Sequence, residues 1–130
     1  MKRRLCWIIL MVAVVFLASS CTTSTSVGGA SLETGYEIDS NHAIVTTSNT
    51  FPAGDEFYYS FYNGSKFGSD VVTLNLIDSE SNEVLLEYDY DVDPDWDIMA
   101  DTTWFNEPGK YKIVILIDGK TRATQEVIIQ

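Results

Sequence analysis

Aspartate residues at alternate positions are the strongest candidate for chemistry in this chain. They occupy every second position between residues 89 and 97, and one more follows at position 101. Because hard cations bind clustered carboxylate oxygens, the spacing is compatible with a calcium site. Its candidate ligands are Asp89, Asp91, Asp93, Asp95, Asp97 and Asp101. The run does not follow the EF-hand pattern, since Pro94 and Ala100 stand where that loop requires glycine and glutamate.

A second interpretation of the same run needs no ligand. Strand alternation would place Glu87, Asp89, Asp91 and Asp93 on one solvent-exposed face. Like charges on such a face also oppose the pairing of exposed strand edges between molecules. The sequence leaves both interpretations open.

Aromatic residues are the second candidate for binding. Phe57, Tyr59 and Phe61 alternate and are expected in the core, which turns Tyr58 and Tyr62 outward. Exposed tyrosines can stack on sugars or contact a protein partner, so Tyr58, Tyr62 and Trp96 are the predicted binding residues. Trp96 and Trp104 flank the acidic run, and we expect at least one of them to be buried.

Catalysis has little support in the sequence. His42 is the only histidine, and no G-x-S-x-G motif, phosphate-binding loop or zinc-ligand spacing is present. We therefore expect a protein that is not an enzyme and that needs no cofactor, with calcium as the one alternative.

The first 21 residues predict where the protein goes. Lys2, Arg3 and Arg4 precede an apolar run over residues 5–18, and small residues then lead to Cys21. This layout is typical of a secretory signal. The apolar run is shorter than the roughly 20 residues that a membrane-spanning helix needs.

The segment Leu17-Ala18-Ser19-Ser20-Cys21 resembles the signal peptides of bacterial lipoproteins. The resemblance implies cleavage before Cys21 and a lipid on its sulfur, which would anchor the protein in a membrane. The family usually has Leu three residues before the cysteine, whereas Ala18 stands there. Ordinary secretion is the alternative, because Ala18 and Ser20 also fit an A-x-A-like cleavage site. Thr22 is not the Asp that retains some lipoproteins at the inner membrane, so the outer membrane or the cell surface is favoured.

Cysteine content and charge agree with this prediction. Cys6 would leave with the signal and Cys21 would carry lipid, so the mature domain would hold no thiol and no disulfide. Loss of Lys2, Arg3 and Arg4 would make the formal net charge of −11 three units more negative. Such a surface repels phosphate backbones, so nucleic-acid binding is not expected.

The remaining residues must supply the elements that position these side chains. Residues 21–35 are rich in Ser, Thr and Gly and are predicted to form a flexible tether after a signal peptide of residues 1–20. Beyond residue 36 the apolar period is two and turn residues recur, which indicates an all-β sandwich or barrel. The predicted strands are 43–47, 56–62, 71–78, 84–93, 98–105, 111–117 and 121–129.

The last predicted hairpin allows a finer prediction. A two-residue turn at Asp118-Gly119 would place Ile115 opposite Arg122 and mix apolar with charged rows. We instead expect a three-residue loop with Gly119 in a bulge, which would place Ile115 opposite Thr121 and keep the core face apolar.

About seven such strands over residues 36–130 resemble an immunoglobulin-like or fibronectin type III-like sandwich. The most specific part of the likeness is Asp101 with Pro108-Gly109-Lys110-Tyr111, where Tyr111 resembles the tyrosine corner of these domains. The expected protein is a membrane-anchored envelope lipoprotein whose single antiparallel sandwich is a non-catalytic binding or assembly module. The alternative is a calcium-dependent or carbohydrate-binding surface module, and the identity of a protein or glycan partner stays open.

Overall fold

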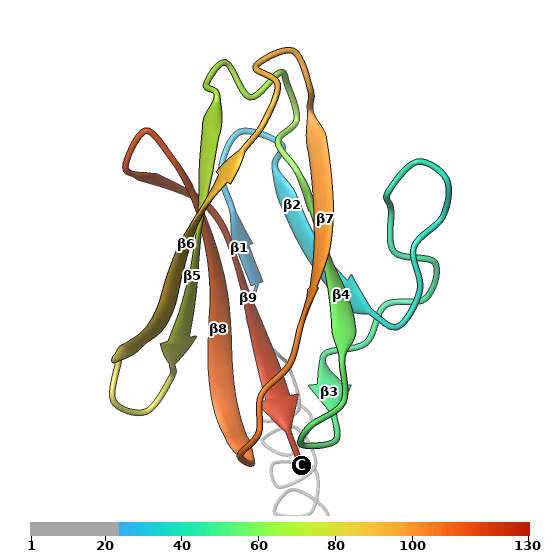
Figure 1. Ribbon diagram of the computed structural model, residues 1–130, viewed down its shortest axis with the longest axis vertical. Helices are drawn as coiled ribbons and strands as arrows, with labels where there is room; N and C mark the ends of the chain where they lie inside the picture. Colours follow the sequence, from blue (N-terminus) through green and yellow to red (C-terminus); the bar gives the residue numbers. More distant parts are fainter. Residues whose placement is uncertain (1–23) are drawn as a thin grey trace, which may run out of the picture.

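A computed structural model describes residues 24–130, and these residues form two facing β-sheets (Figure 1). The larger sheet has six strands and the smaller has three. The strands are β1 (Ser24–Ser26), β2 (Ser31–Gly35), β3 (Thr50–Phe51), β4 (Phe57–Tyr62), β5 (Val71–Asp78), β6 (Val84–Asp91), β7 (Ile98–Thr103), β8 (Gly109–Ile117) and β9 (Lys120–Ile129). The described part of the chain holds no helix suited to crossing a membrane.

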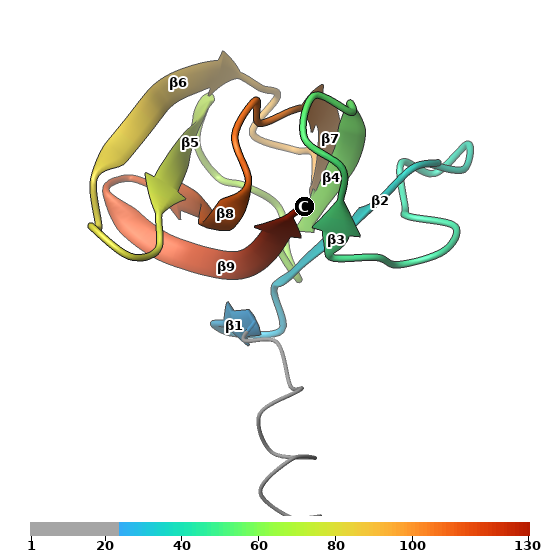
Figure 2. The same cartoon turned by 90° about the horizontal axis from the view of Figure 1, so that it is seen from below.

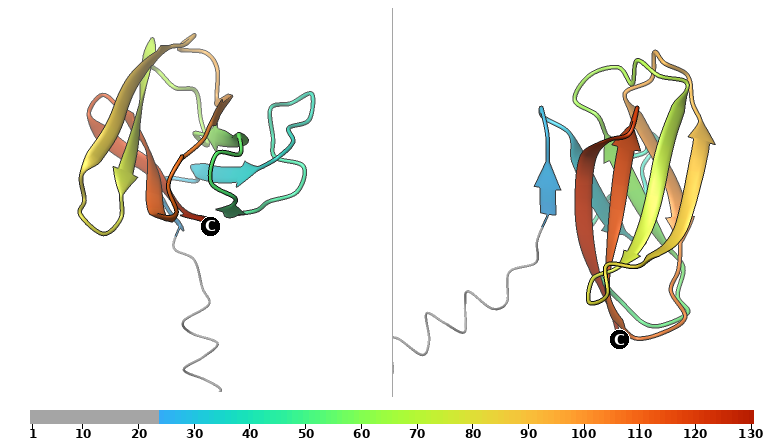
Figure 3. Two further views of the ribbon diagram at one scale, coloured as in Figure 1. Left: turned by 60° about the horizontal axis from the view of Figure 1, so that its bottom comes forward. Right: turned by 90° about the vertical axis from the view of Figure 1, so that its left-hand side faces the viewer.

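The strand order places β6 at one end of the larger sheet. That sheet runs β1-β9-β8-β5-β6, with β3 added in parallel to the end of β9, and the smaller sheet runs β2-β4-β7. Figure 2 looks along the sandwich and has β5, β6, β8 and β9 on one side and β2, β4 and β7 on the other. In the right-hand view of Figure 3 the larger sheet lies across the page, with β1 and β6 at opposite edges. The predicted all-β sandwich is confirmed.

The core lies between the sheets and comes from the alternation of the strands. Phe57, Tyr59 and Phe61 of β4 are fully buried, as their alternation predicted. They pack with apolar residues of β5, β8 and β9, including Val72 and Ile113. Burial of side chains of this size is the main stabilising contribution of such a fold.

The tyrosine corner is present. Tyr111 begins the buried row of β8, and its hydroxyl donates a hydrogen bond to the carbonyl oxygen of Glu107 at 2.8 Å. Its ring stacks on Phe105 with the ring centres 4.1 Å apart. These contacts fix the connection from β7 to β8, because a buried tyrosine hydroxyl needs a partner.

The amino-terminal boundary of the domain differs from the prediction. Residues 24–26 and 31–35 form β1 and β2, so part of the predicted tether belongs to the sandwich. Leu32 is buried opposite Phe61 of β4. The Ser- and Thr-rich composition of this segment gave no sign of that contact. Residues 21–23 lie outside the described part of the chain.

The predicted strand over residues 43–47 is wrong. Residues 36–49 form an excursion beside the smaller sheet, held by the isolated bridges Ile38↔Ile44 and Gly35↔Thr47 (Figure 1). Gly35 permits the close approach, because a Cβ there would lie 2.5 Å from the carbonyl oxygen of Thr46. The excursion buries Ser60, whose hydroxyl donates to the carbonyl oxygen of His42 at 2.6 Å.

The β8–β9 hairpin has a two-residue turn, so the predicted three-residue loop is wrong. Ile117 pairs with Lys120 across Asp118 and Gly119, whose φ angles of 52° and 75° fit a type I′ turn. A register shift between Ile115 and Leu116 then brings Ile115 opposite Ala123, not Arg122. The bulge thus lies inside the strand, where the extra residue returns the buried row of β9 to the core face.

Candidate functional site

A groove of about 630 Å³ lies between β6 and the segment that joins β7 to β8. Both walls carry large apolar side chains. They include Leu85, Leu86, Tyr88, Trp104, Phe105 and Tyr111. We call this cavity the β6 groove.

Four of its side chains are unusually exposed for their size. The exposed fractions are 47% for Leu85, 48% for Leu86, 52% for Tyr88 and 53% for Trp104. Leu86 and Tyr88 lie opposite the buried Leu76 and Leu74 of β5, so they belong to the core-facing side of the larger sheet. They are exposed because β6 is the last strand of the larger sheet, and Figure 2 shows β6 on the side of the sandwich away from β2 and β4 of the smaller sheet.

A short hydrogen-bonded chain lies beside the apolar part of the β6 groove and links the sheets. The hydroxyl of Tyr90 on β6 donates to Oδ2 of Asp101 on β7 at 2.7 Å. Since that bond uses the only hydroxyl proton of Tyr90, the hydroxyl of Tyr59 on β4 donates to Tyr90. These two hydrogen bonds connect β6 to strands β4 and β7 of the smaller sheet.

Burial sets the protonation of these tyrosines. Desolvation raises the pKa of Tyr90 to about 12, with a further rise from Asp101 that the hydrogen bond from Tyr59 partly opposes. Desolvation also raises the pKa of Tyr59, to which the hydrogen bond with Tyr90 adds. Both hydroxyls therefore stay protonated at neutral pH, and the network is a structural link.

The electrostatic character of the β6 groove is acidic. Asp101 and Glu107 are the only charged side chains among the residues that line it. The opposite face of the same edge carries Asp89, which accepts a hydrogen bond from Thr73 of β5 at 2.7 Å. Glu87 and Asp91 share that face by alternation. Cations and cationic polypeptides are the charged partners that this edge attracts.

The predicted calcium ligands do not gather in one place. Asp89 bonds to Thr73, Asp93 accepts from the backbone N–H of Asp95, and Asp101 accepts from Tyr90. Asp95 forms an ion pair with Lys66 at 3.3 Å. Asp91 and Asp97 are exposed and have no side-chain hydrogen bond among residues 24–130. Within those residues, no three acidic or histidine side chains are placed to hold a metal ion.

The predicted aromatic binding residues lie apart from the β6 groove. Tyr58 and Tyr62 point from β4 to the outer side of the smaller sheet, where Tyr62 is exposed and Tyr58 is half-buried. Trp96 lies in the loop between β6 and β7 and is 55% exposed. Trp104 is also exposed, so the expectation that at least one of these two tryptophans is buried is wrong. His42 is exposed in the excursion at a φ of 65°.

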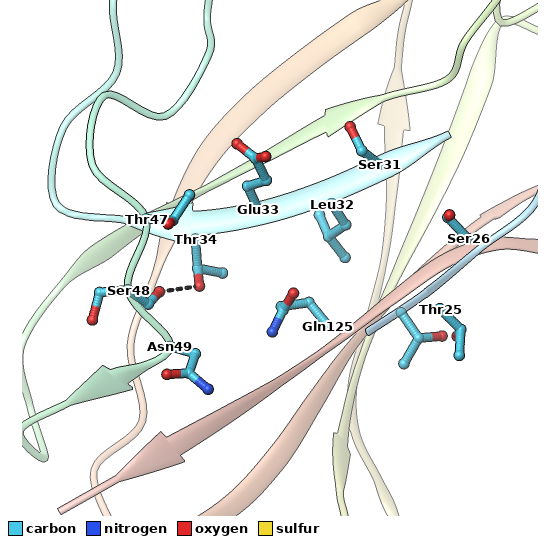
Figure 4. A pocket seen from close by; sticks show the side chains of 11 residues that line it. Thr25, Ser26, Ser31, Leu32, Glu33, Thr34, Thr47, Ser48, Asn49 and Gln125 are labelled. Carbon is cyan, nitrogen blue, oxygen red and sulfur yellow. Dashed lines mark hydrogen bonds between the residues drawn. The ribbon is translucent and has the colours of Figure 1, made fainter. Parts of the chain in front are cut away.

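A second cavity, of about 390 Å³, lies between β2 and the edge formed by β1 and β9. Figure 4 shows Leu32 and Thr34 pointing into it from β2, with Gln125 of β9 facing them. Thr34 and Ser48 bond to each other there: the hydroxyl of Thr34 donates to the carbonyl oxygen of Ser48, and the N–H of Ser48 donates to the carbonyl oxygen of Thr34. The side-chain nitrogen of Asn49 is buried in the wall and has no hydrogen-bond partner within residues 24–130. This cavity has no aromatic side chain and one acidic one, so the β6 groove is the better candidate for binding.

These features define an immunoglobulin-like sandwich. Strands β4 and β7 of the smaller sheet lie across the core from β5, β8 and β9 of the larger sheet, and the tyrosine corner lies at the start of β8. Among solved structures, the chain is similar to a crystal structure of an immunoglobulin-like protein from Pseudomonas aeruginosa. The TM-score is 0.53 at 12% identity, over 83% of this chain and 97% of that one. No protein-family model and no curated protein matches the sequence.

Sequence reasoning missed the β6 groove because it singled out only the acidic face of the predicted strand 84–93 and assigned no binding role to the apolar residues that alternate with it. The available signal was the imbalance of residues 84–93, where bulky apolar side chains alternate with four acidic ones. Nothing in the sequence states that the opposing sheet stops before it covers this row.

Proposed function

We propose that this protein is a lipid-anchored, non-catalytic module of a bacterial cell envelope that binds a protein partner at the β6 groove. The observation that carries the binding role is the exposure of Leu86, Tyr88 and Trp104 around one cavity. Exposed apolar side chains grouped in this way mark interaction sites, and Trp and Tyr dominate the energetics of protein interfaces.

The proposed anchor is Cys21. The segment Leu17-Ala18-Ser19-Ser20-Cys21 supports it, as does the absence of a cysteine in residues 22–130 with which Cys21 could form a disulfide. Two or three acyl chains at about 0.8 kcal/mol per buried CH₂ hold a small domain durably on a membrane. Thr22 after the cysteine supports an outer-membrane or surface location.

A protein partner fits the β6 groove better than a glycan does. Sugar recognition needs several polar groups that converge beside an aromatic face. In the groove the carboxylate of Asp101 is already bonded to Tyr90, and the exposed area is mainly apolar.

Photo-crosslinking in intact cells tests the binding role. A photoreactive amino acid replaces Tyr88 or Trp104 in the groove, Tyr62 or Trp96 at the other candidate surfaces, and Val45 in the exposed excursion as the matched control. We expect adducts from the two groove positions only. Because the expected partner is a protein, protease treatment should degrade the crosslinked partner and remove most of the mass that it adds. Adducts confined to Tyr62 or Trp96 would move the site, and adducts that resist protease would indicate a glycan. Absence of adducts at every position would overturn the binding role.

Mass spectrometry of the mature amino terminus tests the anchor separately. We expect an amino-terminal Cys21 that carries a diacylglyceryl group, and we expect a Cys21→Ser variant to leave the membrane fraction. An unmodified Cys21 at the mature terminus would refute lipid anchoring without touching the groove.

A further inference from the structure

Strand β6 has an unpaired backbone edge. It pairs with β5 on one side, and within residues 24–130 no strand pairs with its other side. The N–H of Val92, just after the strand, donates to the carbonyl oxygen of Asp70 at 2.9 Å. Backbone groups of successive residues point to opposite sides of a strand. Between Leu86 and Tyr90, before the register shift at Val84, the even-numbered residues of β6 therefore bond to β5, and the N–H and C=O groups of Glu87, Asp89 and Asp91 point to the free edge.

The side chains along this edge alternate in chemistry. Leu86 and Tyr88 face the β6 groove, and Glu87, Asp89 and Asp91 face the opposite side. A strand added in antiparallel register would place each of its residues directly opposite one of these, on the same face. Opposite charges across such a pair stabilise it, and apolar side chains on the groove side would cover Leu86 and Tyr88.

The charge of the edge argues against a second copy of the same strand as the occupant. Two β6 strands in antiparallel register would bring acidic rows together, and like charges directly opposite each other are destabilising. The complementary occupant alternates basic with apolar residues.

We propose that β6 accepts an added antiparallel strand from a protein partner in which Lys or Arg residues alternate with apolar residues. The basic side chains lie opposite Glu87, Asp89 and Asp91, and the apolar side chains enter the β6 groove. Backbone hydrogen bonds supply affinity and the two rows of side chains supply specificity, as in other cases of strand addition. This inference rests on the proposed binding role of the groove and specifies its partner.

Calorimetry with a defined peptide tests the inference. The protein is the full chain, expressed with its own export signal and purified in a neutral detergent. The probe is an amidated, acetylated heptapeptide Lys-Val-Lys-Val-Lys-Val-Lys, long enough to follow β6 from Leu85 to Asp91. We expect binding that weakens as salt is added, because the edge charges are screened.

Two altered peptides separate strand addition from simple charge attraction. A peptide of four Lys followed by three Val has the same composition without the alternation. A peptide methylated on the backbone nitrogens of its Lys residues keeps every charge but loses the donors that face β6. We expect each to bind about tenfold more weakly or worse, the effect of losing one to two net hydrogen bonds or apolar contacts. Equal binding of either one would refute the inference.

A pair of protein variants gives the reciprocal test. Glu87→Pro removes an N–H that faces the free edge. Edge strands tolerate proline, because the missing N–H is not one that the sheet itself uses. Glu87→Ala removes the same carboxylate but keeps that donor, so it is the matched control. We expect Glu87→Pro to bind the heptapeptide about tenfold more weakly than Glu87→Ala. Equal affinities would refute strand addition, and the methylated peptide on the unaltered protein keeps the test valid if the proline variant does not fold.

Two outcomes separate this inference from its premise. Crosslinks at Tyr88 and Trp104 without any heptapeptide binding would leave the groove as a binding site and remove the added strand. Concentration-dependent dimers in sedimentation that Glu87→Pro abolishes would assign the edge to a second copy and overturn the inference.

Discussion

Replacement of Tyr90 by Phe is expected to destabilise the domain by more than the loss of one surface hydroxyl. Tyr90 accepts a hydrogen bond from the fully buried Tyr59 and donates one to Asp101. In the Tyr90→Phe variant the hydroxyl of Tyr59 has no partner within residues 24–130, whereas Asp101 is exposed and gains water instead.

The magnitude follows from which group is left unpaired. An unsatisfied buried donor costs about 1–3 kcal/mol, and a net hydrogen bond contributes about 0.5–1.5 kcal/mol. We therefore expect Tyr90→Phe to lower the free energy of unfolding by about 2 kcal/mol and Tyr59→Phe by about 1 kcal/mol. The double variant leaves no orphaned hydroxyl, so its loss is expected to be below the sum by about 1 kcal/mol or more.

Urea unfolding of the four proteins measures these values. The transitions are followed by far-ultraviolet circular dichroism and by tryptophan fluorescence, and coincidence of the two supports a two-state analysis. Two results would refute the reasoning: single-variant losses that add within about 0.3–0.5 kcal/mol, or a Tyr90→Phe loss no larger than that of Tyr59→Phe.

Three further predictions concern the corner, alkaline pH and calcium. Tyr111→Phe keeps the stacking on Phe105 but loses the bond to Glu107, so we expect a loss of about 1 kcal/mol in urea unfolding, and an unchanged midpoint would contradict the role of the corner. Since the folded-state pKa of Tyr90 is raised above the usual 10.0 to about 12, its contribution is complete below pH 10 and is lost as pH rises through 12. After a discount for partial exposure this amounts to about 1–2 kcal/mol, and urea midpoints measured from pH 8 to 12 should fall less steeply in Tyr90→Phe. A calcium titration into the millimolar range should leave tryptophan fluorescence and the melting temperature unchanged, because the candidate carboxylates are dispersed; a saturable change in either would restore the calcium site.

Much of the fold could be predicted from local pattern. The alternation in residues 56–62 and 71–78 corresponds closely to β4 and β5, and Tyr111 was assigned to its corner from the turn before it. Such strands are readable because one face is buried against a continuous core, which forces a period of two.

The failures share one physical cause, which is burial by segments distant in the chain. Leu32 looked like part of a tether because its covering partner, Phe61, lies far along the sequence. Residues 43–47 looked like a strand, but their apolar side chain Ile44 packs against the smaller sheet as part of an excursion. Register in the last hairpin depended on a bulge, which local turn rules do not locate.

The sequence by itself determined the all-β class and the acidic character, because these depend on residue types and nearest-neighbour spacing. The tertiary structure alone decided which alternating rows are covered. Tyr59 on β4 and Leu86 on β6 follow the same local pattern, yet one is fully buried and the other half exposed. The smaller sheet ends at β7 while the larger continues to β6, and that difference in width creates the groove and the free edge.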